Sequence, residues 1–554
     1  MTGTTKRRFS FMILLFAGLF THAGCGGPTP QAAGDECDPD GDPCPSGTVC
    51  APGGDDHICQ IEPGNPCNPA DEDFCLGDSV CGEHPDGGGI CGIPEGGACD
   101  PAEPYCTGDL LCEEIAGGGH KCFPPLHFGG MVFDAATDEA IVGAHVIAFD
   151  DSASAVTDVA VSDVDGNYDL VVPVPRNEDG SPVDDAIYTL RASAADYQTF
   201  PGGVRPALPI DSGEAMSTEA GWRIESAVTD VALIPLPADQ QGLTTIEGSI
   251  LAQDRSNAVL VVAEGAGAGI SAVSDKSGAY TIFNVPDGSY EVKGYRAGVQ
   301  LVPESVEVAG APVIDVNLVA SEDGLGTING NIQIVNAPGG LKTSVVLVVE
   351  STFSETFIKG EVPFGLRAPL SGPPDVDGAF VIDDVPAGDY VVLASFENDD
   401  LVRDPDQAIA GTGLVRVTMP GPGQNITLDE SFKVTEALAV LSPGAEEPEP
   451  VSGNVTLSWA DDSSEKFYTV TVYNAYGDLV WCRARADVLS LLNLDSCDEP
   501  EVPEGNGADV MVPYNGPLEP GMYYQFRATS WREPGGGPTP ISQTEDLRGV
   551  FYVE

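Results

Sequence analysis

The chain has 554 residues, of which 86 are acidic and 24 are basic, so its formal net charge at pH 7 is -62. A surface this acidic excludes nucleic acid as a partner and disfavours direct binding to anionic membranes, because both ligands are themselves negatively charged. Hydrophobic residues make up 42% of the chain and alternate with polar ones, which argues against a disordered protein.

The start of the chain has the features of an export signal. Lys6, Arg7 and Arg8 are positively charged, and the apolar run from Phe9 to Phe20 is too short to span a bilayer. We therefore expect residues 1–24 to be a signal peptide.

Cys25 is the predicted site of lipidation. Ala23-Gly24-Cys25 resembles the end of a bacterial lipobox, in which the cysteine is lipidated and becomes the new N-terminus. His22 departs from that pattern, which prefers Leu, and the alternative is ordinary cleavage after Ala23. The other fourteen cysteines fall into even-numbered groups, and an odd cysteine in an exported chain needs a special role. We expect residues 25–33 to form a lipid anchor and tether.

This interpretation also predicts where the protein resides. The lipid would be its only attachment to a membrane, because no later apolar run is long enough to span one. We expect a location in the bacterial cell envelope, at the outer membrane or the cell surface. Under the alternative cleavage the protein would be secreted.

Twelve cysteines form three repeats of one pattern within residues 34–125. Five residues separate the second cysteine from the third in every repeat, and each repeat begins with Gly-x-x-Cys at Gly34, Gly64 or Gly96. Repeats this short cannot bury a hydrophobic core, so we expect two disulfides in each. Four cysteines allow three connectivities. The twelve are Cys37, Cys44, Cys50, Cys59, Cys67, Cys75, Cys81, Cys91, Cys99, Cys106, Cys112 and Cys122.

The spacing of these cysteines resembles the Dickkopf N-terminal cysteine-rich region of animal secreted proteins. The match covers only the cysteines and a glycine before each third cysteine, so it implies no signalling role. A zinc site is the alternative, with His57, His84 and His120 near the cysteines. The repeats lack the short Cys-x-x-Cys pairs of structural zinc sites. We expect a stiff stalk and no metal.

From Phe128 onward, apolar and polar residues alternate between turn sequences, which predicts an all-β fold. The clearest unit runs from Ser274 to Tyr295. Its Asp275 and Gly278 bracket a turn in which Gly accepts a positive φ, and Val285-Pro286-Asp287-Gly288 forms a second turn. We interpret this unit as a β-hairpin followed by a return strand. Related segments run from Asp163 to Val174 and from Asp375 to Ser395.

These segments lie in regions that resemble carboxypeptidase regulatory-like domains, which have a transthyretin-like β-sandwich. In the first region the matching residues are Gly130-Met131-Val132, Gly143-Ala144-His145-Val146, Asp163 to Tyr168 and Asp196-Tyr197. The resemblance implies small tandem sandwiches without the zinc-peptidase domain of that family. Their expected bounds are 126–237, 244–320 and 326–430. The first carries an acidic insertion from Arg176 to Ala186, and the third an insertion from Thr352 to Pro374.

The last region, residues 434–554, resembles a fibronectin type III domain. The resemblance rests on a Leu-x-Pro-Gly-x-x-Tyr corner that begins at Leu518 and ends at Tyr524. A tyrosine at such a corner ties its hydroxyl to nearby backbone. We expect Cys482 and Cys497 to form a disulfide that closes the loop between them.

The sequence contains no recognisable catalytic motif. His-Glu-x-x-His, the phosphate loop and Gly-x-Ser-x-Gly are all absent, so we expect neither an enzyme nor a cofactor. Calcium is the one metal worth weighing, because closely spaced aspartates offer oxygen ligands. The alternative, which we favour, is that each aspartate caps its own turn. The aspartate groups are Asp38-x-Asp40-x-Asp42, Asp163-x-Asp165 and Asp375-x-Asp377.

Two functions fit these features. The first is a non-catalytic envelope lipoprotein that presents tandem β-sandwiches for adhesion, structure or the binding of an unknown protein or polysaccharide partner. The second is a carbohydrate-binding protein, because starch-binding-like domains share the fold implied by the resemblance. Sugar sites need exposed aromatic side chains beside polar groups. The candidates for such a platform are Tyr295, Phe353, Phe357 and Phe364.

Overall fold

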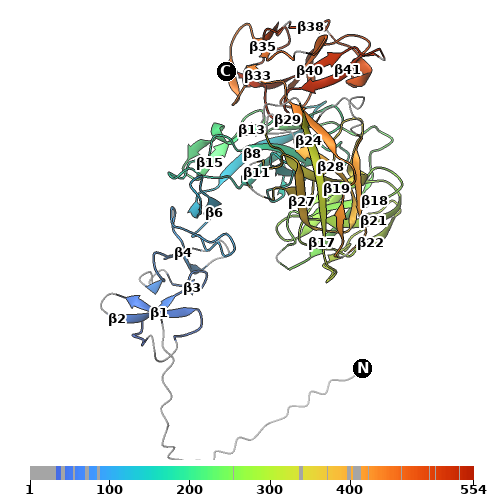
Figure 1. The fold of residues 1–554 in the computed structure, drawn as a ribbon. Coiled ribbons are helices and arrows are strands. Elements are labelled where there is room, and N and C mark those ends of the chain that lie inside the picture. The colour runs from blue at the N-terminus through green and yellow to red at the C-terminus, as the bar shows by residue number, and fades with distance from the viewer. Residues whose placement is uncertain are drawn as a thin grey trace, which may run out of the picture. The chain divides into compact units, whose positions relative to one another are not determined.

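The computed structural model confirms the all-β class (Figure 1). It describes residues 33–38, 44–53, 56–68, 74–83, 88–253, 255–335, 341–370, 372, 374–395, 401–403, 413–421, 423–462, 464–497, 499–505, 507–535 and 537–554. Over these residues the chain forms strands, turns and three short 3-10 helices. No helix in this part of the chain has the length and apolarity needed to span a bilayer.

The chain divides into two compact units. The first contains residues 1–99 and 105–108, and the second contains residues 100–104 and 109–554. In the first unit, short antiparallel strands are packed around cysteines instead of an extensive apolar core. The paired strands are β1 (Thr48–Gly53) with β2 (Asp56–Ile61), and β3 (Pro66–Cys67) and β4 (Val80–Glu83) on either side of β5 (Gly89–Gly92).

The second unit begins with a hairpin and a first two-sheet sandwich. The hairpin pairs β6 (Leu111–Glu114) with β7 (His120–Phe123). One sheet has the order β10 (Ala160–Val161), β9 (His145–Phe149), β12 (Ile187–Ser193), β13 (Ile210–Asp211). The other has the order β11 (Asn167–Val172), β8 (Leu126–Asp134), β15 (Gly221–Ile224), β14 (Met216–Thr218), with β16 (Val231–Leu233) also on β8.

The second sandwich repeats this plan with shorter sheets. One sheet has the order β20 (Ala279–Val285), β17 (Thr244–Leu251), β23 (Leu318–Val319). The other has the order β19 (Ile270–Val273), β18 (Leu260–Glu264), β21 (Gly288–Tyr295), β22 (Glu304–Val308).

The third sandwich ends later than expected. One sheet has the order β27 (Ala379–Val385), β24 (Gly326–Val335), β32 (Phe432–Glu436), β29 (Leu401–Arg403), with β31 (Asn425–Thr427) also on β24. The other has the order β26 (Arg367–Ala368), β25 (Ser344–Val349), β28 (Gly388–Ser395), β30 (Val415–Met419). Because β32 pairs with β24, this sandwich extends past the expected boundary at residue 430.

The predicted hairpin at Asp275–Gly278 is wrong, although its turns are present. Strands β19 and β21 lie in one sheet of the second sandwich and β20 lies in the other, so both turns carry the chain between sheets. The third sandwich separates β27 from β28 in the same way. Alternating apolar residues point into the core in either arrangement, so the pattern alone does not distinguish a hairpin from a sheet-to-sheet corner.

A glycine opposite an aromatic ring recurs in the three sandwiches. Gly130 pairs with Tyr168, Gly248 with Tyr280, and Gly330 with Phe380; these pairs occupy equivalent positions. A Cβ on these glycines would collide with the ring or with a backbone carbonyl that lies over the strand. In the first two sandwiches the tyrosine hydroxyl donates to that carbonyl, at 2.5 Å to Thr229 and 2.6 Å to Val316. In all three sandwiches the glycine makes room for the aromatic ring, and in the first two this ring carries the hydroxyl that bonds to a carbonyl near the end of the sandwich.

The C-terminal sandwich has a three-stranded and a seven-stranded sheet. The smaller sheet contains β33 (Val440–Ser442), β35 (Thr456–Trp459) and β39 (Val510–Pro513). The larger contains β34 (Glu449–Val451), β42 (Val550–Val553), β40 (Tyr523–Arg532), β36 (Phe467–Asn474), β37 (Leu479–Arg483), β38 (Val502–Pro503) and β41 (Thr539–Gln543). The hydroxyl of Tyr524 accepts a hydrogen bond from the backbone N–H of Glu519 at 2.9 Å, which confirms the predicted corner.

The four sandwiches of the second unit pack against one another. One hydrophobic core cluster joins Phe149 of the first sandwich to Tyr295 of the second and Tyr390 of the third. The Asn284 amide donates to the carbonyls of Ala194 and Tyr197 at 2.9 and 2.8 Å, across the boundary between the first two sandwiches. The sandwiches are therefore parts of one packed block.

Candidate functional site

The disulfides of the first two cysteine repeats share one connectivity. The first cysteine of each repeat bonds the third, and the second bonds the fourth. These disulfides are Cys37–Cys50, Cys44–Cys59, Cys67–Cys81 and Cys75–Cys91. The third and fourth cysteines of each repeat lie directly opposite each other on two paired strands. Both disulfides of a repeat therefore attach to the same face of its strand pair. Cys99, Cys106, Cys112, Cys122, Cys482 and Cys497 are also disulfide-bonded, the last two to each other.

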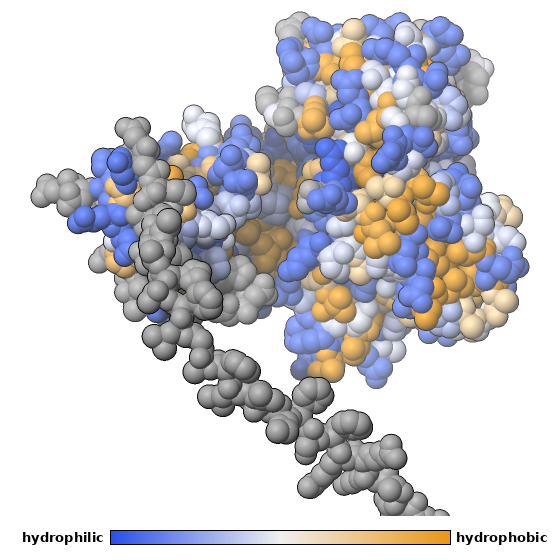
Figure 2. Space-filling view, turned by 90° about the horizontal axis from the view of Figure 1, so that it is seen from below, coloured by the Kyte–Doolittle hydropathy of each residue, from blue (hydrophilic) through white to orange (hydrophobic). Residues whose placement is uncertain are grey.

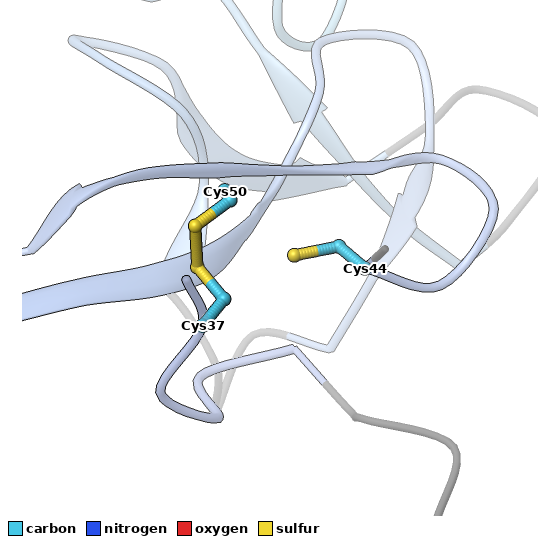
Figure 3. A group of neighbouring side chains, drawn as sticks. All are labelled: Cys37, Cys44 and Cys50. Atoms are coloured by element: carbon cyan, nitrogen blue, oxygen red, sulfur yellow. A yellow bond between two sulfur atoms is a disulfide. The ribbon is translucent and has the colours of Figure 1, made fainter. Parts of the chain in front are cut away.

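The cysteine clusters do not form thiolate metal sites in this structure. The sulfur atoms of Cys37, Cys44 and Cys50 lie within 4.8 Å of one another. Figure 3 shows the bond between Cys37 and Cys50, with the Cys44 side chain pointing toward it. Cys44 is itself bonded to Cys59, so none of the three sulfurs is a free thiolate, which is the form that binds zinc.

The described aspartate turns are closed by backbone hydrogen bonds. Asp163 Oδ1 accepts from the N–H groups of Asp165 and Asn167, each at 2.9 Å. Asp275 Oδ1 makes the equivalent bonds to Ser277 and Ala279. This is the turn-capping role that we favoured over calcium binding. Asp375 instead pairs with Lys342, and Asp40 and Asp42 lie outside the described residues.

The candidate aromatic platform for sugars is not assembled. Tyr295 was expected to be exposed, but only 1% of it is accessible. Its hydroxyl donates to Glu264 of the same sandwich at 2.8 Å, and its ring packs against Tyr390 of the third sandwich. Phe353 and Phe357 are half-buried. Phe364 is 37% exposed, and the Arg296 guanidinium lies 4.7 Å from the centre of its ring. The prediction of an exposed Tyr295 is therefore wrong, because packing between sandwiches covers it.

A cleft between the first and the C-terminal sandwich is a site that the sequence did not reveal. Its volume is about 410 Å³, and carboxylates and tyrosines line it. The principal side chains are Asp211, Glu214, Glu447, Tyr523 and Tyr552. The two tyrosine rings are stacked with their centres 4.8 Å apart. Glu214 and Tyr523 are 309 residues apart, so no local motif could have brought this set together.

The local sequence Asp211-Ser212-Gly213-Glu214 builds the acidic side of the cleft. Asp211 caps the short 3-10 helix η2 (Ser212–Glu214) by accepting from the Gly213 N–H at 2.8 Å. The Ser212 hydroxyl donates to the carbonyl of Val183 at 2.5 Å, which fixes the helix against the first sandwich. The Tyr523 hydroxyl donates to Glu214 Oε1 at 2.7 Å from the C-terminal sandwich.

Each of the two carboxylates has one oxygen without a partner. Asp211 is 2% exposed, and its Oδ2 is buried without a hydrogen-bond partner in the described part of the chain. The Oε2 atom of Glu214 is in the same state. Burial raises the pKa of Asp211 to about 6, aided by the charges of Glu447 and Asp184. Burial also raises the pKa of Glu214 to about 7, and the bond from Tyr523 limits this shift.

The polar groups of the cleft are carboxylates, tyrosine hydroxyls and the Ser226 hydroxyl, and its lining contains no histidine or cysteine. Ionised carboxylate oxygens accept hydrogen bonds, so such a set suits a ligand that carries donors or positive charge.

Comparisons with known proteins do not assign a family. No family model matches the chain, and no curated protein matches it. Among solved structures, the chain is similar to the Bacillus anthracis TIE protein, at 12% identity over 74% of this chain and 68% of that chain, with a TM-score of 0.14. It is also similar to a Streptococcal ancillary pilin, at 14% identity over 56% and 99% of the two chains, with a TM-score of 0.15.

A third solved structure contains two B repeat units of the collagen binding protein of Staphylococcus aureus. It is 11% identical over 76% of this chain and 98% of that chain, with a TM-score of 0.14. At TM-scores this low, none of the three likenesses transfers a fold or an activity to this chain. The all-β architecture rests on the strands and sheets themselves.

Proposed function

We propose that the protein is a non-catalytic lipoprotein of the bacterial cell envelope, which presents a packed block of β-sandwiches for partner binding. The cysteine inventory is the observation that carries this proposal. Of the 15 cysteines, 14 are disulfide-bonded, and the remaining one is Cys25. Cys25 lies outside the described residues, at the position where the sequence resembles a lipobox.

The disulfide repeats support an exported, oxidised location. Structural disulfides persist in oxidising compartments and are rare in the cytosol. The repeats follow directly after residues 25–33, so they would separate an anchored end from the sandwiches. The net charge of -62 suits a protein that stays soluble outside the cell.

The packed sandwiches support presentation over catalysis. Their mutual contacts bury aromatic and aliphatic side chains, and close packing of this kind holds a surface in a defined form. Figure 2 shows that hydrophilic residues (blue) cover much of one face and that apolar patches (orange) lie between them. Such a surface suits binding to other macromolecules.

The proposal is tested by fractionation of the native and the Cys25→Ser proteins. The native protein should partition into detergent and incorporate a palmitate analogue, because a diacylated cysteine supplies the two acyl chains that firm anchoring needs. The Cys25→Ser protein should be found in the aqueous phase without label. Equal detergent partitioning of the two proteins would contradict lipidation at Cys25.

A further inference from the structure

We propose that the cleft lined by Asp211, Glu214, Tyr523 and Tyr552 binds the cationic side chain of a lysine or arginine from a protein partner. This inference rests on the proposed binding function and names the chemistry of the partner. It starts from the two buried carboxylate oxygens, Asp211 Oδ2 and Glu214 Oε2, which have no partner among the described residues. Ionised carboxylate oxygens only accept hydrogen bonds, so a ligand that carries donors would satisfy both atoms.

The neighbouring bonds explain why these two oxygens, and not the other two, are without a partner among the residues that the structure describes. The other oxygen of each carboxylate is already held, Asp211 Oδ1 by the Gly213 N–H and Glu214 Oε1 by the Tyr523 hydroxyl. Both side chains are therefore fixed in position. Arg548 lies close enough to lower the pKa of Asp211, but its guanidinium donates to the carbonyl of Glu446. The bonds made by Arg548 thus leave Asp211 Oδ2 without a donor.

The walls of the cleft suit an apolar stem that ends in a positive charge. Stacked Tyr523 and Tyr552 form one wall, and Pro448 and Pro450 lie beside them. Met216 also lines the cleft and is 64% exposed. Lysine and arginine side chains pack their methylene groups on such surfaces while the charged head reaches acceptors. The strongly negative chain would also draw a basic partner toward the cleft.

A bare metal ion fits the cleft less well. Calcium needs six to eight oxygens, each about 2.4 Å away, so its ligand atoms must crowd together. Among the described side chains, the only groups of three or more His, Cys, Asp or Glu residues whose ligand atoms lie within 4.8 Å of one another are three sets of cysteines. The carboxylates of the cleft are not among them. An elongated organic cation can instead reach two acceptors that lie farther apart.

Binding should strengthen as the carboxylates ionise. Their pKa values are raised to about 6 and about 7, so both are largely ionised only above pH 7. The charged groups around Asp211 are Glu447, Asp184 and Arg548, and the one that acts on Glu214 is Asp211. We therefore expect weaker binding at pH 5 than at pH 8.

The test titrates the full-length protein in detergent with the peptide acetyl-Gly-Lys-Gly-amide. The same peptide with norleucine in place of lysine is the probe without a charge. Ligand-observed NMR should show binding of the lysine peptide only, with at least about tenfold weakening in Glu214→Gln, as expected for loss of one charge-assisted bond. Glu322→Gln removes one charge from an exposed residue away from the cleft and should change the affinity less than about twofold.

Other results would overturn the inference. Equal weakening by Glu322→Gln and Glu214→Gln would show unspecific attraction to the negative chain. Tighter binding of free cadaverine than of the peptide would overturn assignment to a protein side chain, and tight calcium binding lost in Glu214→Gln would make the cleft a metal site. If Glu214→Gln proves unfolded, the native protein still provides a test. Equal affinity of the native protein for the lysine peptide at pH 5 and at pH 8 would contradict the proposal. None of these results affects the fractionation of Cys25→Ser. The proposal of cation binding in the cleft and the proposal of lipidation at Cys25 can therefore be contradicted independently of each other.

Discussion

Gly278 and Gly378 occupy the same place in two related sequences but have different conformations. Gly278 has a φ of +86°, as its turn was predicted to require, whereas Gly378 lies outside the left-handed region. A Cβ on Gly278 would approach the carbonyl of Ile250 to 2.8 Å, but a Cβ on Gly378 would meet only Asn331, at 3.6 Å. One glycine is required by the backbone, and the other is not.

This difference predicts unequal effects of the same substitution. Gly278→Ala should lower the free energy of unfolding by roughly 1 to 3 kcal/mol, because alanine is strained at positive φ and crowds the strand. Gly378→Ala should change it by less than about 0.5 kcal/mol. Urea denaturation of the full chain measures both. Equal losses in the two variants would show that Gly278 does not depend on its conformation.

Glu214 should make the free energy of unfolding fall as the pH rises. A carboxylate in a salt bridge has the opposite effect, because its pKa is lowered in the folded protein. Its pKa is raised to about 7 in the folded protein, so the folded state keeps a proton that the unfolded chain loses near pH 4.5. The free energy of unfolding should therefore fall as the pH rises from about 4.5 to about 7, by on the order of 2 kcal/mol from this group. Melting temperatures across this range should decline less steeply in Glu214→Gln than in Glu322→Gln. Identical slopes would contradict the raised pKa.

The β6–β7 hairpin is joined to the first sandwich by a buried ion pair. Arg176 Nε donates to Glu113 Oε2 at 2.5 Å, and the two residues are 0% and 4% exposed. The Arg176 guanidinium also donates to the carbonyls of Gly180 and Pro124. The insertion that begins at Arg176 therefore has a clear role, which is to receive the end of the third cysteine repeat.

Breaking this pair should be costly, because it leaves Glu113 buried without a counter-charge. Arg176→Met should lower the free energy of unfolding by about 3 to 5 kcal/mol. The exposed pair Lys121–Glu178 joins the same hairpin to the same insertion, so Lys121→Met is a matched control, with a loss below about 1 kcal/mol. Hydrogen exchange should show faster exchange of β6 and β7 amides only in Arg176→Met. Equal protection in both variants would mean that the buried pair does not hold the hairpin.

The packed block of four sandwiches should unfold cooperatively. Arg205 donates to the carbonyl of Tyr476 in the C-terminal sandwich. Asn284 bonds the second sandwich to the first, and the ring of Tyr295 packs against Tyr390 of the third. Calorimetry of the full chain should therefore show one main transition for residues 109–554. Asn284→Ala should lower the temperature of that whole transition, because the sandwiches lose stability together. Four separate transitions would contradict the packing.

Local chemistry made much of the architecture predictable from the chain alone. The cysteine spacing indicated repeats that need crosslinks, and alternating apolar residues indicated strands in an all-β fold. The tyrosine corner at Tyr524 and the positive φ of Gly278 were also predicted, because each depends on a few neighbouring residues.

What the sequence did not determine depends on residues far apart in the chain. Strand alternation is the same for a hairpin and for a sheet-to-sheet corner, so only the tertiary structure separated β19 and β21 from β20. The packing of the second sandwich against the third covers Tyr295, and this packing could not be read from the sequence. Docking of the C-terminal sandwich placed Tyr523 on Glu214 and so created the acidic cleft. Such contacts follow from the packing of whole surfaces, to which every residue of each surface contributes, and a single sequence carries no local signal for them.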